Sequence, residues 1–312
     1  MIGYYAHHRG SGHIQRAASI AEHLHEDVTI LSSIAPDARF DNWVELPLDS
    51  SDDRVDVTAN DTVHWAPLGS AGLRRRMADI ASWIAAARPS VMVVDVSVEV
   101  VALARLQGVP VVTMAQPGVR DDSPHTLGYR MATAIIAPWP SSISPSKLVA
   151  DVAVRLEHVG AISRLAVGTG ATERDPRRVG ILRGYGTRGP SNLERVVDEA
   201  RRLLPGRDWV TPEAGADAVP KMLATCGLVF AHAGQNAVAE VASARVPAIL
   251  VPEERPHEEQ QWLARALERS AFPARIAEPG SPIRVPELGD WTAYCDGTGA
   301  ANAAAIIERV SL

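Results

Sequence analysis

Three glycine-containing segments carry side chains suited to chemistry, and each follows a short apolar run. The first is Gly10-Ser11-Gly12-His13. Its glycines allow a sharp turn and the close approach of a ligand, and the helix that follows offers free N–H groups to an anion or to sugar hydroxyls. A neutral His13 can take a proton from a hydroxyl group. Capping of the helix by His13 is the alternative interpretation.

The second segment is Gly184-Tyr185-Gly186-Thr187-Arg188-Gly189-Pro190. Glycine turns, a hydroxyl group and a helix start again indicate an anion-binding turn, and a flexible surface turn is the alternative. The segment lacks the Lys-Ser/Thr ending of a P-loop, which disfavours ATP hydrolysis. Gln15 occupies the last glycine position of a dinucleotide fingerprint in the first segment, so that motif is excluded as well.

The third segment runs from His232-Ala233-Gly234-Gln235-Asn236 to Glu240, and Gln260-Gln261 follows downstream. We expect a strand to end at His232 and a helix to open at the Gly-Gln-Asn turn. Such a turn presents N–H groups to a diphosphate, and a carboxylate can accept hydrogen bonds from both hydroxyls of a ribose. Adjacent glutamines can both donate to and accept from sugar hydroxyls.

The elements that position the first segment alternate between strands and helices. We expect strands at 1–6, 28–31, 91–94 and 109–114, and helices at 14–24, 73–87 and 98–106. The order strand, helix, strand predicts βαβ units and a parallel sheet, and continuous apolar strands suit a sheet that is buried on both faces.

A second series of the same kind follows a predicted linker at 160–178. We expect strands at 179–182, 209–210, 228–231 and 248–251, helices at 192–204, 218–224, 237–244 and 258–268, and a final helix at 300–310. The predicted fold class is therefore α/β, with two doubly wound Rossmann-like domains, 1–164 and 165–312, facing across a cleft. Such sheets bind ligands at the carboxyl ends of their strands. The final helix can pack back on the first domain.

Composition excludes several classes of protein. The 312 residues are 46% hydrophobic and 22% charged, which is typical of a folded chain, and the net charge of −6 argues against coating of nucleic acid. Cys226 and Cys295 lack metal-ligand spacing, so we expect neither a zinc site nor a disulfide framework, and a reducing cytoplasm fits best. We see no secretory signal and no apolar run of the ~20 residues that a membrane span requires.

The order of these segments resembles the GT-B glycosyltransferases of the MurG-like family, whose second domain is of the glycosyltransferase family 28 C-terminal type. That family carries a Gly-x-Gly-Gly-His-like loop, a Gly-Ser-x-Gly loop, a His-x-Gly-x-x-Thr-x-x-Glu segment and a Gln-Gln or Asp-Gln pair. The resemblance implies an acceptor-side domain at 1–164 and a donor-binding domain at 165–312. This chain departs from the pattern because Ala237 replaces the threonine and because it is short.

The resemblance also implies roles for individual residues. Glu240 would bind the ribose of a nucleotide diphosphate sugar, with UDP favoured, and Gln260 and Gln261 would hold its hexose. The rest of the donor-binding set comprises His232, Gly234, Gln235 and Thr187 along the diphosphate, together with Gly186, Arg188, Gly189, Ala233 and Asn236. His13 would be the catalytic base or an acceptor-site residue, in a loop with Gly10, Ser11 and Gly12. Asp95 resembles the aspartate of a His-Asp dyad, and capping of the next helix, by Asp95 or through Ser97, is the alternative.

The function implied is a metal-independent, inverting transfer of a sugar to the hydroxyl of an unidentified acceptor, without a cofactor. The sequence contains no Asp-x-Asp triplet, the usual metal-diphosphate handle of the other major glycosyltransferase fold. Helix N-termini would neutralise the diphosphate instead.

Other functions stay open at this point. A PseG-like nucleotide-sugar hydrolase is one, because Gly10 to Arg16 matches its Gly-x-Gly-His-x-x-Arg loop. A nucleotide-sugar 2-epimerase and a non-catalytic nucleotide-sugar binder or transferase partner are others. An intact His13 argues against the binder. Arg74 to Arg76 can contact an anionic membrane at its inner face, or lie on a buried helix with a solvated arginine face.

Overall fold

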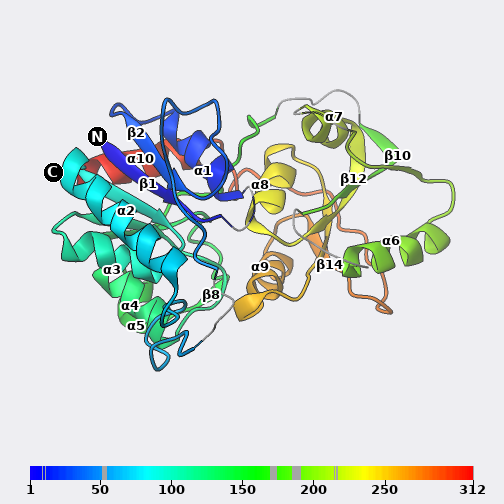
Figure 1. Ribbon diagram of the computed structural model, residues 1–312. Helices are drawn as coiled ribbons and strands as arrows, with labels where there is room; N and C mark the ends of the chain where they lie inside the picture. Colours follow the sequence, from blue (N-terminus) through cyan, green and yellow to red (C-terminus); the bar gives the residue numbers. More distant parts are fainter. Residues whose placement is uncertain are drawn as a thin grey trace.

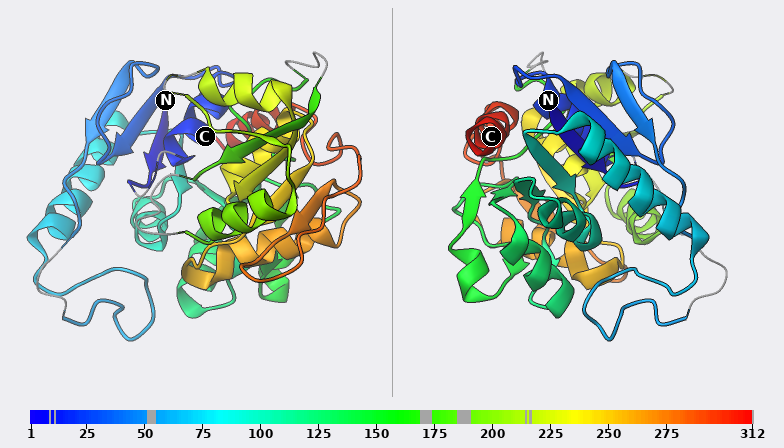
Figure 2. Two further views of the ribbon diagram at one scale, coloured as in Figure 1. Left: turned by 90° about the vertical axis from the view of Figure 1, so that its right-hand side faces the viewer. Right: turned by 60° about the vertical axis from the view of Figure 1, so that its left-hand side comes forward.

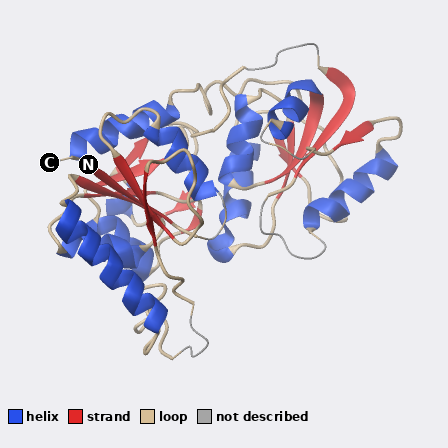
Figure 3. Cartoon of the chain, turned by 45° about the horizontal axis from the view of Figure 1, so that its top comes forward, coloured by secondary structure: helices blue, strands red, loops and turns tan. Residues whose placement is uncertain are grey.

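The computed structural model describes residues 1–8, 10, 12–50, 55–168, 174–184, 191–213, 215 and 217–311. Two parallel sheets, each with helices packed against it, lie side by side in the molecule (Figure 1). Figure 3 shows the strands at the centre of each half with helices around them. The predicted α/β fold with two doubly wound units is confirmed.

The first sheet has seven strands in the order β3-β2-β1-β4-β5-β7-β9. Their bounds are Asn42–Glu45 (β3), Val28–Ser32 (β2), Ile2–Ala6 (β1), Val91–Asp95 (β4), Val111–Met114 (β5), Ala134–Ala137 (β7) and Leu156–His158 (β9). The chain runs outward in one direction from β1 to β3 and in the other from β4 to β9. The order therefore reverses between β1 and β4, where a doubly wound sheet opens a ligand crevice.

Helices cover both faces of this sheet because its central strands are apolar on both sides. One core packs α1 (Gly12–Ala21) and α10 (Gly299–Val310) against the first sheet, and the other packs α2 (Ala71–Ala87) and α3 (Val98–Leu106) against it. The remaining helices of this half are α4 (Ser123–Met131) and α5 (Ala150–Ala153), and β6 (Gly118–Val119) pairs with β8 (Ser146–Lys147) in a separate small sheet.

The second sheet has five strands in the order β11-β10-β12-β13-β14. Their bounds are Asp208–Val210 (β11), Asp175–Leu182 (β10), Cys226–His232 (β12), Ala248–Val251 (β13) and Ala274–Ile276 (β14). One core packs α7 (Ala218–Thr225), α8 (Gln235–Ser243) and α9 (Glu259–Glu268) on this sheet, and another packs α6 (Asn192–Leu203) on it. A short 3-10 helix, η1 (Pro256–Glu258), precedes α9. Here the strand order reverses between β10 and β12.

The last helix leaves the second sheet and packs on the first. Ala303, Ala304, Ile306 and Ile307 of α10 are buried with β1 and α1. Figure 2 shows this helix beside the strands of the N-terminal half. β9 of the first sheet ends at His158, and β10 of the second sheet begins at Asp175. The boundary at residue 164 stays a prediction.

Several local expectations need correction. The segment predicted as a linker, 160–178, already contains the start of β10, where Asp175 pairs with Cys226 across a register irregularity. Pro176 and its charged neighbours were misleading because the strand begins at an exposed end. No element was expected at β3, β6, β7, β8, β9, β14, α4 or α5. The strands among them and α5 are too short to show a period, and Pro124 and Gly128 interrupt the apolar pattern of α4.

One of the three arginines of α2 that could contact a membrane is buried instead. Arg76 is buried and donates to the Tyr5 hydroxyl, the Pro47 carbonyl and Ser33. Arg74 and Arg75 are exposed. None of the helices in the described part of the chain is long and apolar enough to cross a membrane.

Candidate active site

The carboxyl ends of both sheets open into one cleft. Its volume is about 2010 Å³, and its lining includes His13, Arg16, His232, Glu240 and Gln260, which come from both halves of the chain. Small-molecule sites usually occupy about 300–1,000 Å³. The cleft therefore has room for a nucleotide sugar and an acceptor together.

His13 and Asp95 meet at the point where the first sheet reverses its order. Asp95 ends β4, His13 lies in the first turn of α1 after β1, and Ala6 of β1 pairs with Asp95. The Nδ1 atom of His13 lies 3.1 Å from Oδ1 of Asp95, whose side chain is 0% exposed. The imidazole is 18% exposed and lines the cleft. Because Nδ1 faces the carboxylate, Nε2 is the nitrogen available to a substrate hydroxyl.

Asp95 is kept ionised by its neighbours. Burial opposes ionisation, but the charges of Arg16 and His13 prevail and hold the pKa of this carboxyl below its ordinary value. Arg16 donates to Oδ1 at 3.2 Å, and the Tyr4 hydroxyl donates to Oδ2 at 3.4 Å. The capping alternative is observed in its Ser97 form, because the Ser97 hydroxyl accepts the N–H of Val100 and caps α3. The Asp95 carboxylate itself lies against His13 and Arg16.

The loop before α1 is shaped by its glycines. Gly10 has a φ of +92°, a conformation that favours glycine. A Cβ on Gly12 would lie 2.0 Å from Nδ2 of Asn236, so the start of α1 closely approaches the start of α8 in the second half. Gly10 and Gly12 line the cleft, and Ser11 lies outside the described residues.

Glu240 lies on α8 and lines the cleft. Its Oε1 atom accepts a hydrogen bond from Nε of Arg164 at 2.5 Å, and Arg164 comes from the segment between the sheets. Burial raises the pKa of Glu240 above its ordinary value, and Arg164 offsets this only in part. The structure thus places a desolvated carboxyl group, paired with Arg164, on the cleft wall, and its role as the ribose ligand stays a prediction.

His232 ends β12 and is almost completely buried. Its Nδ1 atom accepts the N–H of Gly184 at 2.8 Å, and its Nε2 atom lies 3.3 Å from the Glu253 carboxylate. Burial lowers the pKa of His232 despite Glu253. This imidazole therefore ties the ends of β10 and β12 together as well as lining the cleft.

The turn that opens α8 faces the cleft. Gly234 is the N-cap, and Gln235 and Asn236 follow it, so the N-terminal end of the helix is available to an anion. Oε1 of Gln235 accepts from Arg16 at 3.1 Å, which joins the two halves of the molecule. Ala233 is fully buried in the core, so its side chain cannot touch a donor.

The two glutamines hold a loop of the second domain. Oε1 of Gln260 accepts the N–H of Glu253 at 2.9 Å, and Nε2 of Gln261 donates to the carbonyl of Glu253 at 3.2 Å. Gln260 lines the cleft. The four donor residues predicted at 186–189, Gly186, Thr187, Arg188 and Gly189, lie outside the described residues.

Two arginines are part of this arrangement but were not among the predicted site residues. Arg16 was noted only as part of a loop motif, although its spacing of three residues from His13 places both on one side of α1. Arg164 had no signal in the sequence, because its partner Glu240 is distant in the chain and the contact depends on how the sheets are joined.

Comparison with known proteins identifies the class of protein. Residues 187–272 match the model of the glycosyltransferase family 28 C-terminal domain. The fold is that of MurG from Acinetobacter baumannii, with a TM-score of 0.63 and 14% identity over 99% of both chains. Comparison with curated proteins finds no match.

Two further solved structures share the fold. The spinosyn forosaminyltransferase SpnP has a TM-score of 0.61 and 17% identity, over 99% of this chain and 94% of that one. The spinosyn rhamnosyltransferase SpnG, complexed with thymidine diphosphate, has a TM-score of 0.58 and 19% identity, over 99% of this chain and 96% of that one. The chain is thus a glycosyltransferase of the GT-B fold. Its fold is MurG-like, and its second half carries the family 28 C-terminal match.

Proposed function

We propose that the chain transfers a sugar from a nucleoside diphosphate sugar to an acceptor hydroxyl with inversion at the anomeric carbon. The observation that carries this proposal is the pair formed by His13 and the buried Asp95 at 3.1 Å, on the cleft wall opposite Glu240 and the start of α8. A base on one side of a cleft and an anion-binding helix end on the other suit attack by one substrate on another.

In the proposed reaction, Nε2 of His13 takes the proton of the acceptor hydroxyl as its oxygen attacks the anomeric carbon. The new C–O bond forms while the bond to the diphosphate breaks on the opposite face, which inverts the configuration. Asp95 stabilises the imidazolium and orients its ring. Arg16 keeps Asp95 ionised and, through Gln235, links it to the donor side.

The departing diphosphate needs positive charge. The N-terminus of α8 faces the cleft, and Arg183 and Arg255 also line it. We therefore propose that transfer requires neither Mg²⁺ nor Mn²⁺ and no cofactor. UDP is the favoured nucleotide, from the MurG-like order of the segments. The SpnG structure holds thymidine diphosphate, so dTDP belongs in the same test.

The experiment incubates the purified protein with UDP-, dTDP- and GDP-sugars without an acceptor, in chelator and then with Mg²⁺. Release of nucleoside diphosphate is followed, and thermal shift with each diphosphate runs in parallel. Stabilisation by UDP, about 2.7 kcal/mol at 100 times its Kd, with little turnover supports a transferase. Rapid turnover with water would instead indicate the hydrolase, and the absence of stabilisation by any nucleotide would overturn the donor assignment.

The proposal extends to peripheral contact with a membrane that carries the acceptor. Arg74 and Arg75 on α2 are exposed and can face anionic lipid. Co-sedimentation with anionic vesicles, compared with neutral vesicles and with Arg74→Gln/Arg75→Gln, tests this extension. Equal binding of the variant and the native chain would contradict it.

A further inference from the structure

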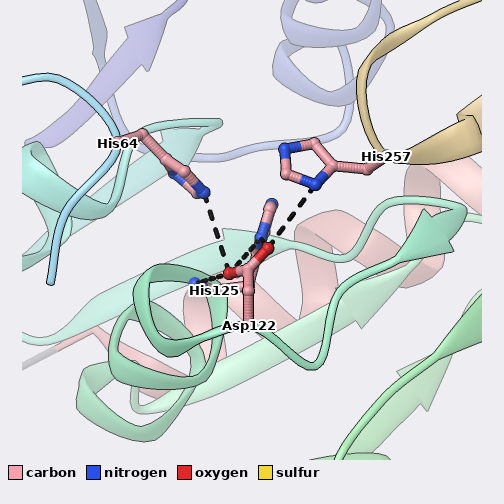
Figure 4. Close-up of side chains that lie close together, drawn as sticks. All are labelled: His64, Asp122, His125 and His257. Atoms are coloured by element: carbon pink, nitrogen blue, oxygen red, sulfur yellow. Dashed lines mark hydrogen bonds and ion pairs between the residues drawn. The ribbon is translucent and has the colours of Figure 1, made fainter. Parts of the chain in front are cut away.

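Four side chains that the proposed reaction does not use lie together at one end of the cleft. They are His64, Asp122, His125 and His257 (Figure 4), and one ligand atom from each lies within 4.8 Å of those of the other three. His64 precedes α2, Asp122 and His125 begin α4, and His257 lies in η1. The first three come from the N-terminal half and the fourth from the other half.

The distances to the Asp122 carboxylate divide the three histidines into two groups. Nε2 of His64 lies 3.8 Å from Oδ1 of Asp122, and Nδ1 of His257 lies 3.5 Å from Oδ2. In a tetrahedral site with metal–ligand bonds of about 2.0–2.1 Å, neighbouring ligand atoms are roughly 3.3–3.4 Å apart. The two imidazoles are thus near the separation that a shared cation produces, and too far from the carboxylate for strong hydrogen bonds.

His125 is related to Asp122 differently. Its Nδ1 atom lies 2.8 Å from both carboxylate oxygens, a hydrogen-bond distance. Its Nε2 atom lies 2.9 Å from a guanidinium nitrogen of Arg120, which can only donate. Nε2 therefore accepts and Nδ1 carries the proton that Asp122 accepts. His125 orients the carboxylate, as residues behind metal ligands commonly do.

Nε2 of His64 is a buried nitrogen with no hydrogen-bond partner among the described residues. A polar atom buried in this way favours a ligand at that position. Glu259 lies 3.5 Å from Arg120 and offsets its charge.

The backbone holds these side chains in place. The carboxylate of Glu99 accepts the N–H groups of His64 and Trp65 at 2.8 and 2.9 Å. His257 has a φ of +60°, a left-handed backbone conformation that is uncommon outside glycine. A Cβ on Gly118 would lie 2.3 Å from the His257 carbonyl oxygen, so the two halves of the molecule are packed backbone to backbone here.

We propose that His64, Asp122 and His257 bind one divalent transition-metal ion of the zinc class, and that the bound ion holds the two halves of the molecule together. Two imidazoles and one carboxylate suit Zn²⁺ and related ions and do not suit Mg²⁺ or Ca²⁺, which prefer oxygen ligands. The proposal is independent of the reaction proposed above, and no catalytic step passes through the ion.

The test is a calorimetric titration of the full chain with ZnCl₂ after dialysis against a chelator. We expect one ion per chain, and at least a 100-fold loss of affinity in His64→Gln/His257→Gln. His125→Gln should lose roughly 10–100-fold, because it removes only the orienting group. The matched control, His23→Gln/His25→Gln, also removes two histidines and should bind Zn²⁺ as the native chain does, and MgCl₂ should give no binding heat.

Equal zinc affinity in the two double variants, or no binding by the native chain, would overturn the site. Circular dichroism of each zinc-free variant establishes that it is folded. Solution scattering tests separately whether the ion holds the two halves together. Zn²⁺ should reduce the radius of gyration of the native chain but not that of His257→Gln. If Zn²⁺ binds but the radius of gyration does not change, the ion does not hold the two halves together, and the proposed metal site itself still stands.

Discussion

At the scale of single residues, the buried Asp95 carboxylate controls what His13 can do. We expect His13→Ala and Asp95→Asn each to lower kcat by about 10²–10⁴-fold and to leave nucleotide affinity unchanged, because both act on the acceptor proton. Steady-state kinetics with thermal shift by UDP measures both effects. Tyr4→Phe is the control, since it removes only the hydroxyl at 3.4 Å from Asp95 and should change kcat only slightly. Full turnover in His13→Ala would contradict the mechanism.

Glu240 gives a pH-dependent prediction at the same scale. Its pKa is raised by burial in the folded chain, so ionisation of Glu240 costs folding free energy once the pH rises above the ordinary glutamate value of about 4.3. We expect Glu240→Gln to raise the Tm of the ligand-free protein at pH 8 and to leave it unchanged near pH 4. Gln keeps an oxygen acceptor for Arg164.

The same substitution should weaken UDP binding by about 1–3 kcal/mol, because a charged hydrogen bond to the ribose is lost. Calorimetric scans across the pH range and a UDP titration measure the two effects separately. A variant that is less stable than the native chain at pH 8 would show that the ion pair with Arg164 outweighs burial.

At the scale of elements, β6 and η1 meet where Gly118 faces His257. Gly118→Ala places a Cβ against rigid backbone, so we expect η1 to move away, with a more open molecule in solution scattering and weaker zinc binding. Gly108→Ala is the matched control, because Gly108 also has a positive φ, +78°, but a Cβ there meets nothing within 4 Å. Both variants carry the left-handed strain, and only Gly118→Ala should separate the halves. Equal scattering curves would refute the contact.

At the scale of the whole molecule, the stability of the first half depends on α10, the last helix of the chain. Ile307 is fully buried against the first sheet, so Ile307→Ala should destabilise that half by about 2–5 kcal/mol. Urea denaturation gives the change in the free energy of unfolding, and hydrogen exchange of β1 and β4 shows which half it affects. Asn302→Ala, on the exposed side of α10, should stay within about 0.5 kcal/mol of the native chain.

The alternation of strands and helices could be predicted from the sequence alone, and so could the position of the loops that follow them. Apolar periodicity and turn residues act within windows of a few residues, so β1, β4 and α3 were predicted nearly as they lie. Parallel strands end at one edge of a sheet, and for this reason His13 and Asp95 could be expected at the same cleft. Short edge elements such as β3 and β9 have too few residues to show a period.

Which distant residues meet depends on the tertiary structure. Arg164, which follows β9 in the chain, donates to Glu240 of α8, and Arg16 donates to Gln235 because the starts of α1 and α8 lie close together. His64, Asp122 and His257 come together because the two sheets direct their carboxyl ends at each other. Such contacts depend on strand order and on the packing of one half against the other, which no local window of sequence contains.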